Sequence, residues 1–203
     1  LATLFLRRLE LPVVLSDVDE SRVESAIEGV RAELAKQVAK GRLAEAKARF
    51  LGGIVTGGTG LDRYEGCDLV LEAVFEEMEV KREVFGGLEG VVDPGCLLLT
   101  NTSSLSVTGM AEELAHPERV AGMHFFNPVA VLPLVELVRT PATDDATLRT
   151  AWEVTGRLGK RGVLVKDAPA FVVNRLLTRM FSVLLGAVER GSPMSTADAA
   201  ALR

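Results

Sequence analysis

The chain has few of the residues on which many functional sites depend. Its 203 residues include only two cysteines, two histidines, one tryptophan and one tyrosine, and aromatic residues make up 5% of it. Cys67 and Cys96 lie too far apart in sequence to fit a metal-ligand spacing, so we expect free, reduced thiols and predict no metal site. Reduced thiols favour a cytoplasmic location.

Charge and hydropathy exclude two further classes of protein. The net charge is -5 at pH 7, and no basic cluster with interleaved aromatic residues occurs, which argues against nucleic acid as a partner. No apolar run approaches the roughly 18 residues that a membrane-spanning helix needs. With 48% hydrophobic and 25% charged residues, the composition is that of a globular protein.

Both ends of the chain have the pattern of interrupted helices. The chain starts at Leu1 without an initiator methionine, and its first residues already look like a helix interior. The last residues, 197–203, stop inside another helical pattern. We therefore expect a fragment of a longer protein.

Short apolar runs alternate with helical patterns along most of the chain. Runs that are apolar on both faces are typical of a mainly parallel sheet covered by helices on both sides. The predicted strands are 11–17, 54–56, 68–74, 96–100, 120–125, 134–138 and 162–165. The predicted helices are 3–9, two within 20–50 broken near Gly41, 79–91, a short one ending at Leu114, 144–158, and 171–188 opened by Pro169.

The last of these helices leaves the alternation. We therefore predict a doubly wound, Rossmann-like α/β domain over residues 1–167, followed by the beginning of an all-helical C-terminal domain over residues 168–203. Phe125, Phe126 and the single tryptophan, Trp152, are expected in the core.

An acidic residue closes an early strand of the predicted sheet. Ligands of doubly wound sheets bind where the carboxyl ends of the strands converge. A carboxylate there can accept hydrogen bonds from both ribose hydroxyls of an adenine nucleotide and repels a 2′-phosphate, so Asp17 favours NAD over NADP. Alternatively, Asp17 is a turn or helix-capping acid, since Asp19, Glu20 and Ser21 follow it.

One histidine and one glutamate stand within apolar strands. His124 lies near the end of the run 120–125, and Glu136 lies in the middle of the run 132–138. An ionised glutamate in such a strand costs several kcal/mol unless it is paired, and the histidine of a neighbouring strand is the most plausible partner. Such a pair orients the imidazole for acid/base chemistry near neutral pH, although it can also be a purely structural ion pair.

Four segments, in order along the chain, carry a resemblance to a known family. They are Asn101-Thr102-Ser103-Ser104, then the run 122–129 around His124, then Pro133-Leu134-Val135-Glu136, then Phe171-Val172-Val173-Asn174-Arg175. Together they resemble L-3-hydroxyacyl-CoA dehydrogenase, most closely the dehydrogenase unit of bacterial multifunctional fatty-acid β-oxidation enzymes. The resemblance extends over essentially the whole chain.

The resemblance implies an activity and a set of catalytic residues. The family oxidises the 3-hydroxyl group of an L-3-hydroxyacyl-CoA to a ketone and passes a hydride to NAD. It implies that His124 is the general base and that Glu136 pairs with its other ring nitrogen. It also implies that Ser103 and Asn174 hydrogen-bond the substrate oxygen and stabilise the charge that develops there.

The resemblance also implies a cofactor site and partners. Asp17 is expected at the adenosine ribose, Glu76 and Lys81 along the NAD cleft, and Ser103 and Asn127 near the nicotinamide. Lys40 is a weaker candidate for the phosphates of CoA. An acyl-CoA substrate and a homodimer, or a place in a multifunctional β-oxidation complex, are the expected partners.

Each of these residues also has a structural interpretation. Ser103 can cap a helix, Asn127 can shape the turn before Pro128, and Lys81 can be a solvated helix residue. Glu76 can be an acid in the first turn of a helix, and Asn174 requires some polar partner in its apolar surroundings.

Two parts of the family pattern are missing from the chain. A Gly-x-Gly-x-x-Gly loop is absent, and Gly52-Gly53 and Gly57-Gly58-Thr59-Gly60 are interpreted as loops because no helix N-terminus follows them. Most of the helical domain is missing too. We expect a gap or an exposed edge in the sheet.

Two alternatives to the dehydrogenase therefore stay open. One is a truncated, non-catalytic unit retained for assembly in a multienzyme complex. The other is a related hydroxyacid or sugar dehydrogenase that uses a lysine base.

Overall fold

The strands of the described residues form two sheets. A computed structural model describes residues 1–201. The smaller sheet pairs β1 (Val13–Ser16) with β2 (Val55–Gly58). The larger sheet has the order β3 (Leu69–Glu72), β4 (Leu97–Thr100), β5 (Val120–Phe125), β6 (Leu134–Arg139) and β7 (Arg161–Lys166). Within residues 1–201, β1 and β3 each pair on one edge only, so the expected gap in the sheet is confirmed.

All strand pairs in the described part of the chain are parallel except one. β5 and β6 run antiparallel, joined by residues 126–133, and this pair places His124 directly opposite Glu136. The predicted Rossmann-like, mainly parallel architecture is confirmed. The antiparallel pair was not part of the prediction, because apolar runs alone do not reveal strand direction.

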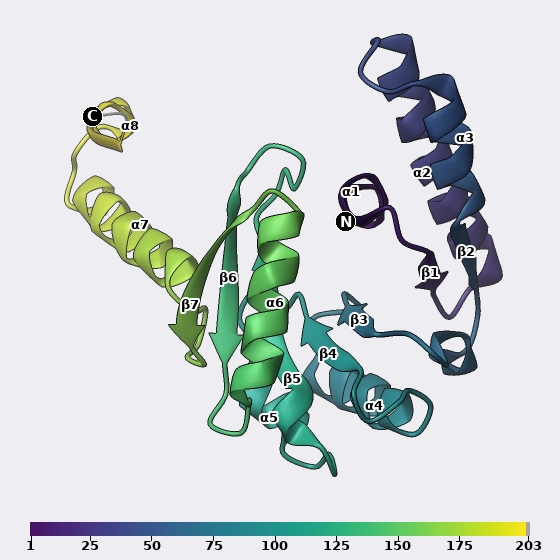
Figure 1. Ribbon diagram of the computed structural model, residues 1–203. Coiled ribbons are helices and arrows are strands. Elements are labelled where there is room, and N and C mark those ends of the chain that lie inside the picture. Colours follow the sequence, from purple (N-terminus) through teal and green to yellow (C-terminus); the bar gives the residue numbers. More distant parts are fainter. Residues whose placement is uncertain (202–203) are drawn as a thin grey trace.

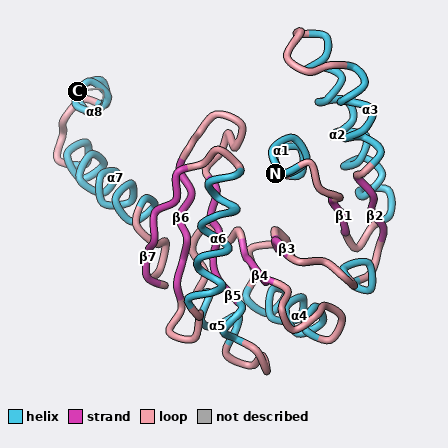
Figure 2. The backbone as a smooth tube through the Cα atoms, viewed as in Figure 1, coloured by secondary structure: helices cyan, strands magenta, loops and turns pink. Residues whose placement is uncertain are grey.

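Helices cover both faces of the larger sheet. α4 (Met78–Glu89) and α5 (Val107–Ala111) pack on one face through a cluster that includes Phe85, Leu98 and Met110. α1 (Ala2–Leu9) and α6 (Asp145–Arg157) pack on the other through a cluster that includes Leu99 and Met123. Figures 1 and 2 show α6 crossing one face of the sheet while α4 and α5 lie behind it.

A helical hairpin extends from the smaller sheet. α2 (Glu20–Ala39) and α3 (Glu45–Gly53) pack on each other and on β2, with Leu34, Leu51 and Val55 in a third buried cluster. Asp19 caps α2, because its side chain accepts hydrogen bonds from the backbone N–H and hydroxyl of Ser21. Two short 3-10 helices, η1 (Leu61–Tyr64) and η2 (Pro117–Arg119), complete the connections.

Gly57 and Gly58 lie in a strand, although they were predicted to lie in a loop. β2 continues through Gly57 and Gly58. A Cβ atom at Gly57 would lie 2.5 Å from the carbonyl oxygen of Leu15 and 2.6 Å from a methyl group of Val23. Glycine is therefore required at residue 57 because β1 and α2 approach the strand so closely.

The described part of the chain closes with two helices that lean away from the sheets. α7 (Val173–Glu189) and α8 (Met194–Ala201) lie to the left in Figure 1. The prediction placed the start of α7 at Phe171 with Pro169 near its first turn, but the helix begins two residues later, because Ala170 and Phe171 have positive φ angles. The predicted helical pattern beyond residue 201 lies outside the described residues.

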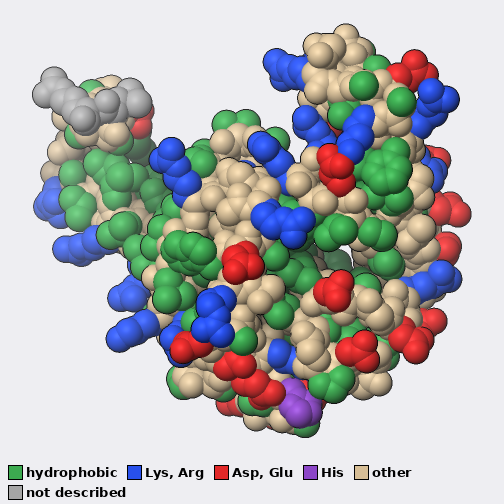
Figure 3. Space-filling view, viewed as in Figure 1, with side chains coloured by type: hydrophobic (Ala, Val, Ile, Leu, Met, Phe, Trp, Pro, Cys, Tyr) green, Lys and Arg blue, Asp and Glu red, His purple; other side chains and the backbone are tan. Residues whose placement is uncertain are grey.

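α7 carries many exposed apolar side chains, including Leu176, Phe181 and Val183. Figure 3 shows hydrophobic side chains, in green, among those that cover this helix. No helix within residues 1–201 is long and apolar enough to cross a membrane.

Candidate active site

His124 and Glu136 form a hydrogen-bonded pair at the heart of the site. Because β5 and β6 are antiparallel with these two residues in register, both side chains project from the same face. Nδ1 of His124 lies 2.9 Å from Oε2 of Glu136, and the two residues are only 6% and 1% exposed. The pairing predicted from sequence is therefore present. When Nδ1–H donates this hydrogen bond to Glu136, Nε2 is the ring nitrogen left free to accept a proton.

The second carboxylate oxygen of Glu136 is also bound. Oε1 accepts hydrogen bonds from the backbone N–H groups of Val172 and Val173, at 3.0 and 2.9 Å. These groups open α7, where a negative charge is favourable. Three hydrogen bonds thus compensate the burial of the carboxylate.

Aromatic rings limit the position of the imidazole. The ring centroid of Phe126 lies 4.5 Å from that of His124, and the ring centroid of Phe171 lies 5.9 Å from it. Both rings are tilted relative to the imidazole. Two aromatic rings therefore pack against the imidazole and restrict its orientation.

A pocket of about 280 Å³ opens beside His124. It lies at the carboxyl ends of β3, β4 and β5, where doubly wound sheets bind ligands. Its lining combines polar and apolar side chains: Ala73, Val74, Glu76, Lys81, Asn101, Ser103, His124, Phe125 and Asn127. Four residues predicted from sequence to serve a cofactor, Glu76, Lys81, Ser103 and Asn127, are thus brought together with the predicted base.

Glu76 organises the loop that carries Ser103. Its Oε1 accepts hydrogen bonds from the Thr102 hydroxyl at 2.6 Å, from the Ser103 N–H at 2.9 Å and from the Ser103 hydroxyl at 3.3 Å. Burial raises the pKa of Glu76, but these hydrogen bonds and the charge of Lys81 outweigh it and hold the pKa below its ordinary value. Glu76 is therefore a carboxylate at neutral pH.

Lys81 is a buried residue of the pocket lining and pairs with two carboxylates. Its ammonium is 2.7 Å from Oε1 of Glu72 and 3.3 Å from Oε2 of Glu76. Glu72 also accepts from the Thr100 hydroxyl and the Val74 N–H, at 2.7 and 2.6 Å. The ammonium thus ties β3 and β4 to α4, and the alternative of a solvated lysine is wrong because its side chain is 1% exposed.

Two asparagines hold neighbouring parts of the site. Nδ2 of Asn174 donates to the carbonyl oxygen of Ser103 at 3.3 Å, which joins α7 to the Ser103 loop. Oδ1 of Asn101 accepts from the N–H of Phe125 at 3.0 Å and so links the ends of β4 and β5. From sequence, Asn101 was named only as part of a segment, without a role, and Glu72 was not singled out. The signal that singled out Glu136, a carboxylate in an apolar strand, applies equally to Glu72.

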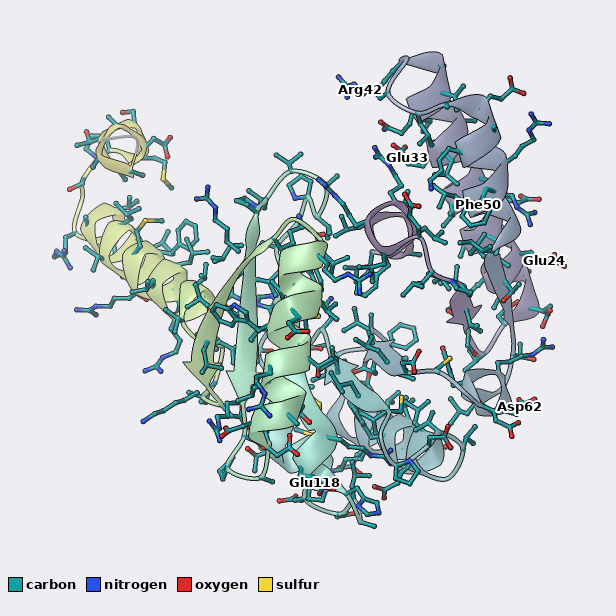
Figure 4. The ribbon with its side chains drawn as sticks, viewed as in Figure 1. Glu24, Glu33, Arg42, Phe50, Asp62 and Glu118 are labelled. Atoms are coloured by element: carbon teal, nitrogen blue, oxygen red, sulfur yellow. The ribbon has the colours of Figure 1, made fainter. Side chains whose placement is uncertain are left out.

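Asp17 and Lys40 lie outside the pocket lining. Asp17 follows β1 with its side chain 39% exposed and its carboxylate 3.8 Å from Arg22. Lys40 ends α2 and is exposed, near the turn of the helical hairpin that Arg42 marks in Figure 4. No contact within the described residues joins Lys40 to the site.

Known proteins are similar to this chain in sequence. The family described as 3-hydroxyacyl-CoA dehydrogenase, NAD binding domain, matches residues 1–168. A 3-hydroxybutyryl-CoA dehydrogenase of Bradyrhizobium diazoefficiens is 43% identical over 84% of this chain and 58% of its own length. A fatty acid oxidation complex subunit alpha of Psychrobacter arcticus is 33% identical over 93% of this chain and 26% of its own length.

A solved structure agrees with these relatives. The crystal structure of 3-hydroxybutyryl-CoA dehydrogenase from Escherichia coli K12 matches with a TM-score of 0.89 at 36% identity, over 93% of this chain and 40% of that one. The present chain thus spans 58% or less of each of these three proteins. The chain belongs to the 3-hydroxyacyl-CoA dehydrogenase family, and residues 1–168 match its NAD-binding domain.

Proposed function

We propose that this protein binds NAD and oxidises an L-3-hydroxyacyl-CoA to the 3-ketoacyl-CoA, as in fatty-acid β-oxidation. The observation that carries the proposal is the buried His124–Glu136 pair, 2.9 Å apart, beside a polar pocket at the strand ends. The names of the relatives support the substrate class, since they include dehydrogenases of 3-hydroxybutyryl-CoA and of a fatty acid oxidation complex.

In this proposal His124 is the general base. Nε2 takes the proton of the substrate hydroxyl, while Glu136 holds Nδ1 and stabilises the imidazolium that results. Proton transfer by a positioned base contributes roughly 10²- to 10⁴-fold to a rate. Ser103 and Asn174, which already contact each other, would hydrogen-bond the substrate oxygen.

The residues around the pocket fit a nicotinamide cofactor. Glu76 is a carboxylate at the pocket wall, and the Ser103 hydroxyl and the Asn127 amide lie beside it, so a polar, planar ring finds both donors and acceptors. When bound, NAD supplies the hydride acceptor. Asp17 would hold the adenosine ribose, and Lys81 would act by fixing Glu76.

Further parts of the proposal concern organisation and partners. Residues 1–167 would be the cofactor domain and residues 168–203 the beginning of a helical domain. The exposed apolar side chains of α7 support assembly as a homodimer or within a β-oxidation complex. Two free cysteines support a cytoplasmic location. Lys40 remains a candidate for the CoA phosphates.

A non-catalytic unit kept for assembly is the second candidate. The observation in its favour is that β1 and β3 each have one unpaired edge within the described residues, at the place where the cofactor domain should be continuous. The intact His124–Glu136 pair favours catalysis.

One assay separates the two candidates. Oxidation of NADH is followed by its absorbance with acetoacetyl-CoA as substrate, for the wild type, His124→Gln and His116→Gln. The proposal predicts that His124→Gln lowers the rate roughly 10²-fold or more, while His116→Gln, at the other, exposed histidine, keeps the wild-type rate. Equal rates for wild type and His124→Gln would overturn the proposal, and no rate in any of them would favour the non-catalytic unit.

A further inference from the structure

The segment between β7 and α7 has an unusual backbone. Residues 167–173, here called the connector, include Ala170 with φ 58° and Phe171 with φ 47°. Two consecutive non-glycine residues in the left-handed region are disfavoured, and such strain persists only where the surroundings impose it. The structure should therefore contain contacts that hold the connector in this shape.

The connector is fixed at its beginning and in its middle. The carboxylate of Asp167 accepts hydrogen bonds from the Ser106 hydroxyl at 2.8 Å and from the Thr108 N–H at 2.8 Å, which ties the connector to α5. The N–H of Ala170 donates to the carbonyl oxygen of Ser104 at 3.4 Å. The side chain of Phe171 is 1% exposed within the core cluster that also holds Val138 and Val165.

The connector ends on the carboxylate of Glu136. The N–H groups of Val172 and Val173 both donate to Oε1, although α7 has no side-chain cap of its own at Val172. Glu136 therefore caps α7 from a neighbouring strand. With Ala170 and Phe171 in the left-handed region, the N–H groups of Val172 and Val173 face the Glu136 carboxylate on β6.

We propose that the connector is a positioning element of the site: it uses the Val172 and Val173 N–H groups to fix the carboxylate of Glu136 against Nδ1 of His124. This inference rests on the proposed function for its consequence in catalysis. Ala170 and Phe171 are then positioning residues, because they act through Glu136 and do not touch the reacting atoms. The arrangement also makes the start of α7 part of the site, so a displacement of that helix would release the carboxylate.

Amide hydrogen exchange and the ring nitrogen resonances of His124 test the inference by NMR, on the chain without cofactor or substrate. In Ala170→Val, a β-branched residue cannot adopt the left-handed conformation readily. We expect exchange at Val172 and Val173 to become roughly ten-fold faster, since each loses a hydrogen bond to a charged group. We also expect the His124 ring to lose its preference for the proton on Nδ1.

Two variants serve as controls. Ala170→Gly accommodates the positive φ and should keep both the slow exchange and the His124 tautomer. Ala146→Val makes the same change as Ala170→Val at an exposed position in the first turn of α6, where the backbone is helical, and should leave both unchanged. The inference would be overturned if Ala170→Val kept wild-type exchange at Val172 and Val173 and the wild-type His124 tautomer. It would also be overturned if Ala170→Gly lost the slow exchange and the tautomer.

A second variant covers the case in which Ala170→Val does not fold. Glu136→Gln leaves the connector sequence intact but removes the charge from the acceptor, so exchange at Val172 and Val173 should again be about ten-fold faster. Unchanged exchange at both residues would overturn the inference. Because none of these measurements needs turnover, a chain that fails to reduce acetoacetyl-CoA but shows these responses would refute the proposed function alone.

Discussion

Loss of the Lys81 charge should destabilise the protein far more than loss of an exposed charge on the same helix. Lys81 and Glu72 are 2.7 Å apart with side chains 1% exposed. Lys81→Met replaces the ammonium with an apolar side chain of similar length. It leaves the Glu72 carboxylate buried without a counter-charge.

The expected loss of stability in each variant depends on which charged partner the remaining residue keeps. Breaking a buried ion pair from one side costs about 3–5 kcal/mol, so we expect Lys81→Met to cost that much. Glu72→Gln should cost less, about 1–3 kcal/mol, because Lys81 keeps Glu76 at 3.3 Å. In the double variant no uncompensated charge is left at either residue. The double variant should therefore lose at least about 1 kcal/mol less of the free energy of unfolding than the two single variants lose together.

Equilibrium unfolding in urea, followed by circular dichroism, gives these free energies. Glu79→Gln is the matched control, since Glu79 lies on α4 with its side chain 88% exposed, 3.7 Å from Arg82. It should cost no more than about 1 kcal/mol. A Lys81→Met variant as stable as Glu79→Gln, or a double variant whose cost equals the sum, would refute the reasoning.

Two further predictions concern thiols and acid. Burial raises the pKa of the Cys96 thiol to about 11 and also raises the pKa of the Cys67 thiol. Both thiols should therefore react slowly with a disulfide reagent at neutral pH and become reactive in urea. Rapid labelling of Cys96 in the native protein would contradict this. Glu89, like Glu76, has a pKa below its ordinary 4.5, because hydrogen bonds from the Ala115 and His116 N–H groups and the charge of Arg119 outweigh burial. The free energy of unfolding should therefore decline as the pH falls through and below 4.5, and the decline should be shallower in Glu89→Gln. The same decline in Glu89→Gln as in the wild type would contradict a lowered pKa at Glu89.

The pair at the centre of the site could be predicted because it depends on a local signal and a simple constraint. A glutamate inside an apolar strand needs a partner, and the chain has only two histidines. His124, in the apolar strand nearest in sequence, was therefore the most plausible partner. The directions of β5 and β6, which place the residues opposite each other, did not enter that reasoning.

Other features depend on tertiary position and escaped prediction. The burial of Lys81 results from the meeting of α4 with β3 and β4, and the sequence of α4 alone is compatible with a solvated lysine. Trp152, expected in the core, is 50% exposed, because α6 turns Leu148, Ala151 and Thr155 inward and leaves the tryptophan at its flank. The connector conformation was not predicted either, since Phe171 begins an apolar helical pattern, and the contact of Val172 and Val173 with Glu136 joins residues that are distant in sequence.

The pH dependence of the rate tests the role of the pair most directly. NAD-dependent oxidation of 3-hydroxybutyryl-CoA is measured across pH for wild type and Glu136→Gln. An amide that donates to Nδ1 forces the ring proton onto Nε2, where the base is needed, so the maximal rate should fall on the order of ten-fold or more. The pH of half-maximal rate should also move down, because the imidazolium loses its counter-charge. A Glu136→Gln variant with the wild-type rate and the wild-type profile would contradict the assignment of His124 and Glu136 as the catalytic pair.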